Sequence, residues 1–144
     1  MLNRLGHLRR RVAARARPAS ADRAGDLQAF LQVARQSFLQ MQAAWDRADL
    51  PALGVLASEP LMHELRQQLQ QRRPGPNHTE VLELQARLLD LEELQGGYLA
   101  SVEFSGWMRE ELDEAAAPFR ELWLLANEKA AGRGWQLARV QSLC

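Results

Sequence analysis

The stretch that decides the fold is Tyr98-Leu99-Ala100-Ser101-Val102-Glu103-Phe104-Ser105-Gly106-Trp107-Met108-Arg109. Its side chains alternate between apolar and polar, which is the pattern of a half-buried β-strand with two unlike faces. One face carries the apolar residues Tyr98, Ala100, Val102, Phe104 and Met108. The other face carries Ser101, Glu103, Ser105 and Arg109, with Trp107 among them. The stretch therefore predicts a strand in a sheet with one buried side.

Further strands are predicted on both sides of this one. Downstream, an acidic loop over 110–116 leads to a third strand over 117–128 and, after a turn, to a fourth over 135–143. Upstream, Gln95-Gly96-Gly97 is a good hairpin turn. The segment 79–94 before it alternates as a strand until the phase flips at Leu88-Leu89, which a β-bulge would explain. Its Leu, Glu, Gln and Ala content also suits a helix, and its periodicity leaves both structures open.

The first part of the folded chain predicts three helices. Asp26 is a suitable cap for a long helix that runs to about Arg47. Its apolar residues recur at three- and four-residue steps and form one broad stripe: Leu27, Phe30, Leu31, Ala34, Phe38, Met41, Ala44 and Trp45. A short second helix follows the cap Asp49, and a third opens at Ser58 and ends before a loop over 72–77.

Helices followed by consecutive hairpin strands predict an α+β domain with an antiparallel sheet. A twisted sheet of this length should curl around the long helix and leave a concave face. The 144 residues suffice for one domain, and 47% apolar with 25% charged residues is typical of a folded protein. We expect a basic, disordered tail over 1–25 and a single domain over 26–144.

Charge is unevenly distributed along the chain. Residues 1–25 hold seven arginines against one acid, Asp22, and so carry +6; because the whole chain is formally neutral, the remainder carries −6. Leu2, Leu5, Leu8 and Val12 fall near one helical face of this tail. The tail could lie on an anionic membrane, resembles a mitochondrial transit peptide, or serves only as a solubilising linker. The acidic remainder would repel phosphate, so nucleic-acid binding is not expected.

The reactive residues of the chain favour a non-enzymatic role. The three histidines are far apart, the only cysteine is Cys144, and no phosphate loop or nucleophile motif is present, so we predict no metal and no cofactor. Glu103 and Glu121 are the carboxylates that could act as a base. We expect instead that Glu103 faces solvent and that Glu121 pairs with a nearby arginine.

The aromatic residues offer better candidates for binding. Trp45 is expected in the core between helix and sheet. Trp107, on the polar face of its strand, either forms a patch for a partner or is covered by the tail or the acidic loop. If the concave face is open, its predicted lining is Phe38, Trp45, Tyr98, Phe104 and Trp123. For membrane or partner contact the candidates are Trp107 and the tail residues Arg4, Arg9, Arg10 and Arg11.

Several short motifs, in order, resemble the Tim44-like domain family over residues 26–143. They are Phe30-Leu31-Gln32-Val33-Ala34-Arg35-Gln36-Ser37-Phe38 with Ala44-Trp45-Asp46, Asn77-His78-Thr79-Glu80-Val81, Ser101-Val102-Glu103-Phe104-Ser105-Gly106, Phe119-Arg120-Glu121-Leu122-Trp123 and Gly134-Trp135-Gln136-Leu137-Ala138. The fit is to the bacterial relatives of the C-terminal domain of the mitochondrial presequence-translocase subunit. At Ala138-Arg139-Val140-Gln141 the chain departs from the family pattern.

The resemblance implies a cone-shaped fold similar to nuclear transport factor two, with three helices on a curved four-stranded antiparallel sheet and with 79–94 as a strand. It also implies a protein peripheral to the bacterial inner membrane, with the mitochondrial inner membrane as the alternative. Our hypothesis is a non-enzymatic domain that binds anionic phospholipid or a membrane protein. The alternative is small-ligand binding or catalysis in the concave pocket. A homodimer formed sheet to sheet is a third option.

Overall fold

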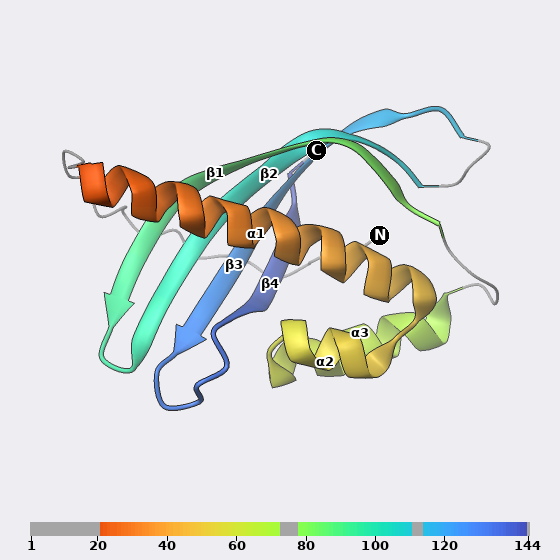
Figure 1. Ribbon diagram of the computed structural model, residues 1–144. Coiled ribbons are helices and arrows are strands. Elements are labelled where there is room, and N and C mark those ends of the chain that lie inside the picture. Colours follow the sequence, from red (N-terminus) through yellow and green to blue (C-terminus); the bar gives the residue numbers. More distant parts are fainter. Residues whose placement is uncertain (1–20, 73–77, 111–113, 144) are drawn as a thin grey trace.

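The computed structural model describes residues 21–72, 78–110 and 114–143. Three helices precede a four-stranded sheet, and the long first helix crosses the sheet's concave side (Figure 1). The elements are α1 (Ala21–Arg47), α2 (Leu50–Leu56), α3 (Glu59–Gln71), β1 (Glu80–Leu94), β2 (Gly97–Arg109), β3 (Ala117–Glu128) and β4 (Trp135–Ser142). This confirms the predicted α+β class, the cone-shaped arrangement and the extended conformation of the segment after Thr79.

Helix α1 begins earlier than its sequence predicts. The chain is already helical at Ala21, where the described residues begin, so Asp26 lies inside the helix and does not cap it. The alanines and arginines around this position are good helix formers and give the backbone no reason to stop at an acidic residue. The predicted division between tail and domain at residues 25 and 26 therefore falls within a continuous helix.

The two short helices follow the predicted capping signals. Asp49 precedes α2, and its carboxylate accepts a hydrogen bond from the Ala52 amide at 3.1 Å. Ser58 occupies the corresponding position before α3 without a side-chain hydrogen bond, and a proline lies in the first turn of each helix. Proline fits there because its missing N–H would have no partner in the first turn.

The sheet is an antiparallel meander with the strand order β1-β2-β3-β4. Its register confirms the bulge predicted at Leu88-Leu89, because the β1–β2 pairing shifts between Leu88 and Asp90. A second shift, between Val81 and Glu83, has no counterpart in the sequence prediction. The two irregularities leave the segment from Glu83 to Leu88 as the regular middle of β1.

A glycine allows β1 and β2 to approach closely beside the second shift. Gly106 has φ +154° and is paired with Leu84. A Cβ atom there would overlap the Glu83 carbonyl oxygen, and the backbone conformation itself disfavours other residues. The local path of the two strands therefore depends on the absence of a side chain at this position.

The end of α1 is tied to the chain segments that follow it in space. The Asp46 carboxylate accepts hydrogen bonds from the Thr79 amide at 2.6 Å and from the Thr79 hydroxyl at 3.0 Å. The Arg72 guanidinium donates to the carbonyl oxygens of Trp45 and Asp46, at 2.6 and 3.1 Å. These contacts satisfy exposed helix-end carbonyls and fix where α3 ends and β1 begins.

Candidate interaction surfaces

Aromatic side chains fill the concave side of the sheet beneath α1. Phe38 of α1, Phe104 of β2 and Trp123 of β3 are each fully buried. The Phe38 ring centroid lies 4.8 Å from that of Phe104 and 5.0 Å from that of Trp123. Phe119 stacks on Phe38 at 5.5 Å. These rings contact one another where an open cone would hold a ligand.

Glu121 stands among these rings and corrects one expectation from the sequence. Its side chain is only 3% exposed and accepts a hydrogen bond from the Trp123 indole N–H at 2.9 Å, and no ion pair to an arginine is found within the described residues. Burial raises the pKa of Glu121 to about 7, and the Trp123 hydrogen bond opposes this shift. The predicted arginine pair is therefore wrong, because β3 turns this carboxyl inward.

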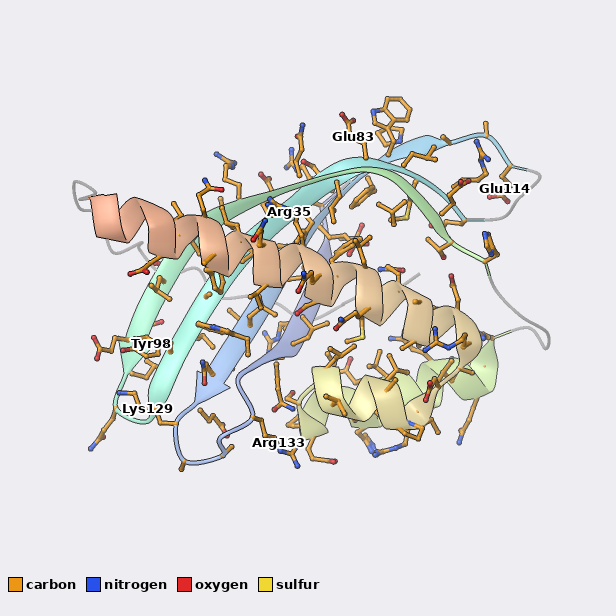
Figure 2. The ribbon with its side chains drawn as sticks, in the orientation of Figure 1. Arg35, Glu83, Tyr98, Glu114, Lys129 and Arg133 are labelled. Carbon is orange, nitrogen blue, oxygen red and sulfur yellow. The ribbon has the colours of Figure 1, made fainter. Side chains whose placement is uncertain are left out.

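The remaining predicted pocket residues lie at the margins of the core. Trp45 is 3% exposed, as expected for a core residue, with its ring beneath the Arg72 guanidinium at 5.4 Å. Tyr98 is half-buried near the β1–β2 turn, where the Lys129 ammonium lies 5.3 Å from its ring centroid (Figure 2). The five predicted lining residues thus share the inner side, but Tyr98 is separated from the Phe38 cluster.

The outer face of the sheet carries Trp107 and a small charge network. Trp107 is 45% exposed and is flanked by its cross-strand neighbours Glu83 and Pro118. Glu103 shares this face, but its side chain is only 15% exposed because Arg87 and Arg120 bind its two carboxylate oxygens, at 2.9 and 3.3 Å. Trp107 is therefore exposed on this face, and its contact with a partner stays a prediction.

A shallow groove of about 360 Å³ lies between α1 and the start of β1. It is lined by Leu39, Gln42, Ala43, Asp46, Arg47, His78, Thr79 and Val81. Gln42 is 2% exposed, and neither polar atom of its side chain has a hydrogen-bond partner in the described part of the chain. The sequence offered no signal for this groove, since Gln42 interrupts an otherwise apolar stripe without altering its period.

Within 21–72, 78–110 and 114–143, no group of three or more histidine, cysteine or acidic side chains could hold a metal ion. Of the helices in these ranges, none is sufficiently long and apolar to span a membrane. The candidate contacts Arg4, Arg9, Arg10 and Arg11 lie outside the described residues and stay predictions.

Comparison with protein families decides the relationship. The model of the Tim44-like domain matches residues 13–142, which is nearly the whole chain. This chain belongs to the Tim44-like family. The family is generally non-enzymatic and membrane-associated. Three of the motifs that carry the resemblance lie in β2, β3 and β4. These strands pack around the aromatic core of this Tim44-like domain.

Among solved structures, the Tim44-like domain is similar to a ketosteroid isomerase-like protein from Erwinia carotovora atroseptica. The two chains share 14% identity, the similarity covers 76% of this chain and 93% of the other, and the TM-score is 0.41. A search of curated proteins finds no match.

Proposed function

We propose that this Tim44-like domain is a non-enzymatic interaction domain on the inner membrane, which it reaches by binding anionic phospholipid. The observation that carries the proposal is the filled concave side. Phe38, Phe104 and Trp123 are fully buried against one another, so their apolar surface lies in the folded core and is not accessible to a ligand. Binding is then a task for the exterior of the domain and for the basic N-terminal segment.

Charge favours an anionic partner for that segment. Residues 1–25 carry +6 while the remainder carries −6. Each basic residue close to an anionic lipid surface contributes about 1 kcal/mol of binding free energy. An acidic body is repelled by the same surface, so the arrangement orients the domain with its N-terminal segment toward the lipid.

Flotation on liposomes containing cardiolipin tests this proposal. Replacing Arg4, Arg9, Arg10 and Arg11 by glutamine should weaken binding by about 1000-fold, since four contributions of about 1 kcal/mol are removed. High salt should weaken binding of the unmodified protein as well. A matched control replaces the exposed Arg66 and Arg133 of the folded body and should float like the wild type.

Absence of binding by the unmodified chain would remove the membrane part of the proposal. A loss of about 30-fold in the control, from two contributions of about 1 kcal/mol, would show that overall charge, and not the N-terminal segment, governs the association. Neutral liposomes of phosphatidylcholine provide the reference for binding that does not depend on charge.

One observation favours a second candidate function, which is ligand binding or proton transfer on the concave side. Glu121 is a buried carboxyl whose pKa of about 7 would suit a general base. A base also needs room for a substrate beside it, and the neighbouring rings pack on one another. Shifts of the indole signals in NMR spectra on adding apolar carbonyl compounds would support this function, and unchanged spectra would argue against it.

A further inference from the structure

The two edges of the sheet differ in how they are covered. At the β4 edge, Ala57 forms a bridge with Leu137, and the Ser58 amide donates to the Leu137 carbonyl at 2.9 Å. At the other edge, β1 pairs with β2 alone among the described strands. A strand edge without a partner presents backbone N–H and C=O groups that can pair with another chain.

The pairing segment of this edge is delimited by the two register shifts of β1. Regular pairing with β2 runs from Glu83 to Leu88, and a bulge at either end distorts the backbone beyond it. Leu82 and Leu89 stand at the two ends and are 47% and 37% exposed. The usable edge is therefore short and is bordered by exposed apolar side chains.

The charged residues of this segment complement those of the same segment in a second copy of the chain. Its only charged residues are Glu83 and Arg87, placed symmetrically about Gln85. All three share the outer face, because they oppose Trp107, Glu103 and Ser105 of β2. In Figure 2 the Glu83 side chain points away from α1, and the Arg87 side chain is 70% exposed despite its contact with Glu103.

We propose that β1 pairs antiparallel with β1 of a second copy of this chain, about a two-fold axis at Gln85. Opposed residues in a sheet face the same side. If the helices of both copies lie on the same side of the joined sheet, each pair of opposed residues must therefore be equally distant from one central residue. The two-fold axis then passes at the level of a residue and not between two residues. Only the register centred on Gln85 places each Glu83 opposite Arg87 of the other copy.

Neighbouring registers lack this complementarity. An axis at Leu84 or at Ala86 sets both charged groups opposite uncharged residues, and an axis at Arg87 opposes two guanidinium groups. Opposite charges across a strand pair stabilise it, whereas like charges destabilise it. Because the ladder is short, the expected dissociation constant is on the order of 10–100 µM.

Sedimentation velocity on the full chain, from about 1 to about 300 µM, tests the proposal by oligomeric state. The wild type should pass from monomer to dimer. Glu83→Arg and Arg87→Glu should each stay monomeric, because each opposes like charges in both pairs. An equimolar mixture of the two variants should form heterodimers, since the mixture restores both opposite-charge pairs. Glu93→Arg, an exposed position beyond the bulge, is the matched control and should dimerise.

Cross-linking gives a second measurement that does not depend on charge. Gln85→Cys in a Cys144→Ser background places two thiols opposite each other on the axis, and oxidation should join the copies. Glu93→Cys in the same background should not cross-link. A wild type that stays monomeric throughout, a dimer that Glu83→Arg leaves intact, or a mixture that stays monomeric would each overturn the proposal. Circular dichroism confirms that every variant is folded.

Discussion

Glu121 is the residue whose environment differs most from that of an ordinary surface carboxylate. Its folded-state pKa is about 7 against a reference value of 4.5, so the folded protein holds this proton more tightly than the unfolded chain. The resulting stabilisation is fully present below pH 4.5 and is lost as the pH rises to about 7. It amounts to on the order of 3 kcal/mol.

The Glu121→Gln variant should abolish this pH dependence. Glutamine stays neutral and can still accept the Trp123 hydrogen bond, so its unfolding free energy should lack the decline between pH 4.5 and 7 that the wild type shows. Urea denaturation at several pH values measures the difference between the two proteins. Glu128→Gln, at the exposed end of the same strand, should keep the wild-type slope. Equal slopes for wild type and Glu121→Gln would contradict the assignment.

The orientation of Glu121 could not be predicted from the sequence. Leu122 and Leu124 alternate with Glu121, Trp123 and Leu125, so both faces of the strand carry apolar residues and no period marks the buried one. The sequence does not predict the environment of Gln42 either, since a single amide in an apolar stripe does not reveal whether its hydrogen bonds are satisfied.

At the scale of elements, the β1–β2 hairpin depends on Gly106. A side chain there must displace the Glu83 carbonyl or distort the strand. We expect Gly106→Ala to destabilise the protein by about 2 to 4 kcal/mol, from overpacking and backbone strain together. Urea denaturation provides the measurement.

Gly54 is the control for this substitution. It lies in α2, and no atom lies within 4 Å of the position that a Cβ would occupy. Gly54→Ala should stabilise the protein by about 0.5–1 kcal/mol, because alanine is the better helix former. If the two substitutions shifted stability in the same direction, the role given to Gly106 would be wrong.

Sequence patterns predicted the elements better than their limits. The stripe of α1 and the alternation of β2 each predict an element, because many residues contribute to a period. The caps of the short helices predict where those helices begin. The start of α1 depends on one capping position, and a good helix-forming flank at Ala21 outweighed the signal at Asp26. The shift beside Glu83 was not predicted, because it depends on how closely two backbones approach.

For the whole molecule, Phe38 connects the helical layer to the sheet. Its ring contacts aromatic side chains of both β2 and β3 and is fully buried. Phe38→Ala should cost about 3–5 kcal/mol, the usual cost of deleting a buried aromatic ring. Helical circular dichroism and tryptophan fluorescence should report the same lowered midpoint, because both layers lose their common contact.

Leu39, the next residue of the same helix, is the control for this substitution. It is 46% exposed, so Leu39→Ala should change stability by less than about 1 kcal/mol. If Phe38→Ala lowered only one of the two signals, helix and sheet would be separate folding units, contrary to the single core described above.

The covered β4 edge has a consequence for how the protein behaves at high concentration. Ser58 and Ala57 occupy backbone groups of Leu137 that another strand would need, so this part of β4 cannot accept a further strand. In a dimer formed through β1 as proposed, a further copy cannot add by strand pairing at Leu137, which opposes open-ended growth by this route. Disrupting the junction at Ser58 would open a second growth point and turn a self-limiting association into polymerisation.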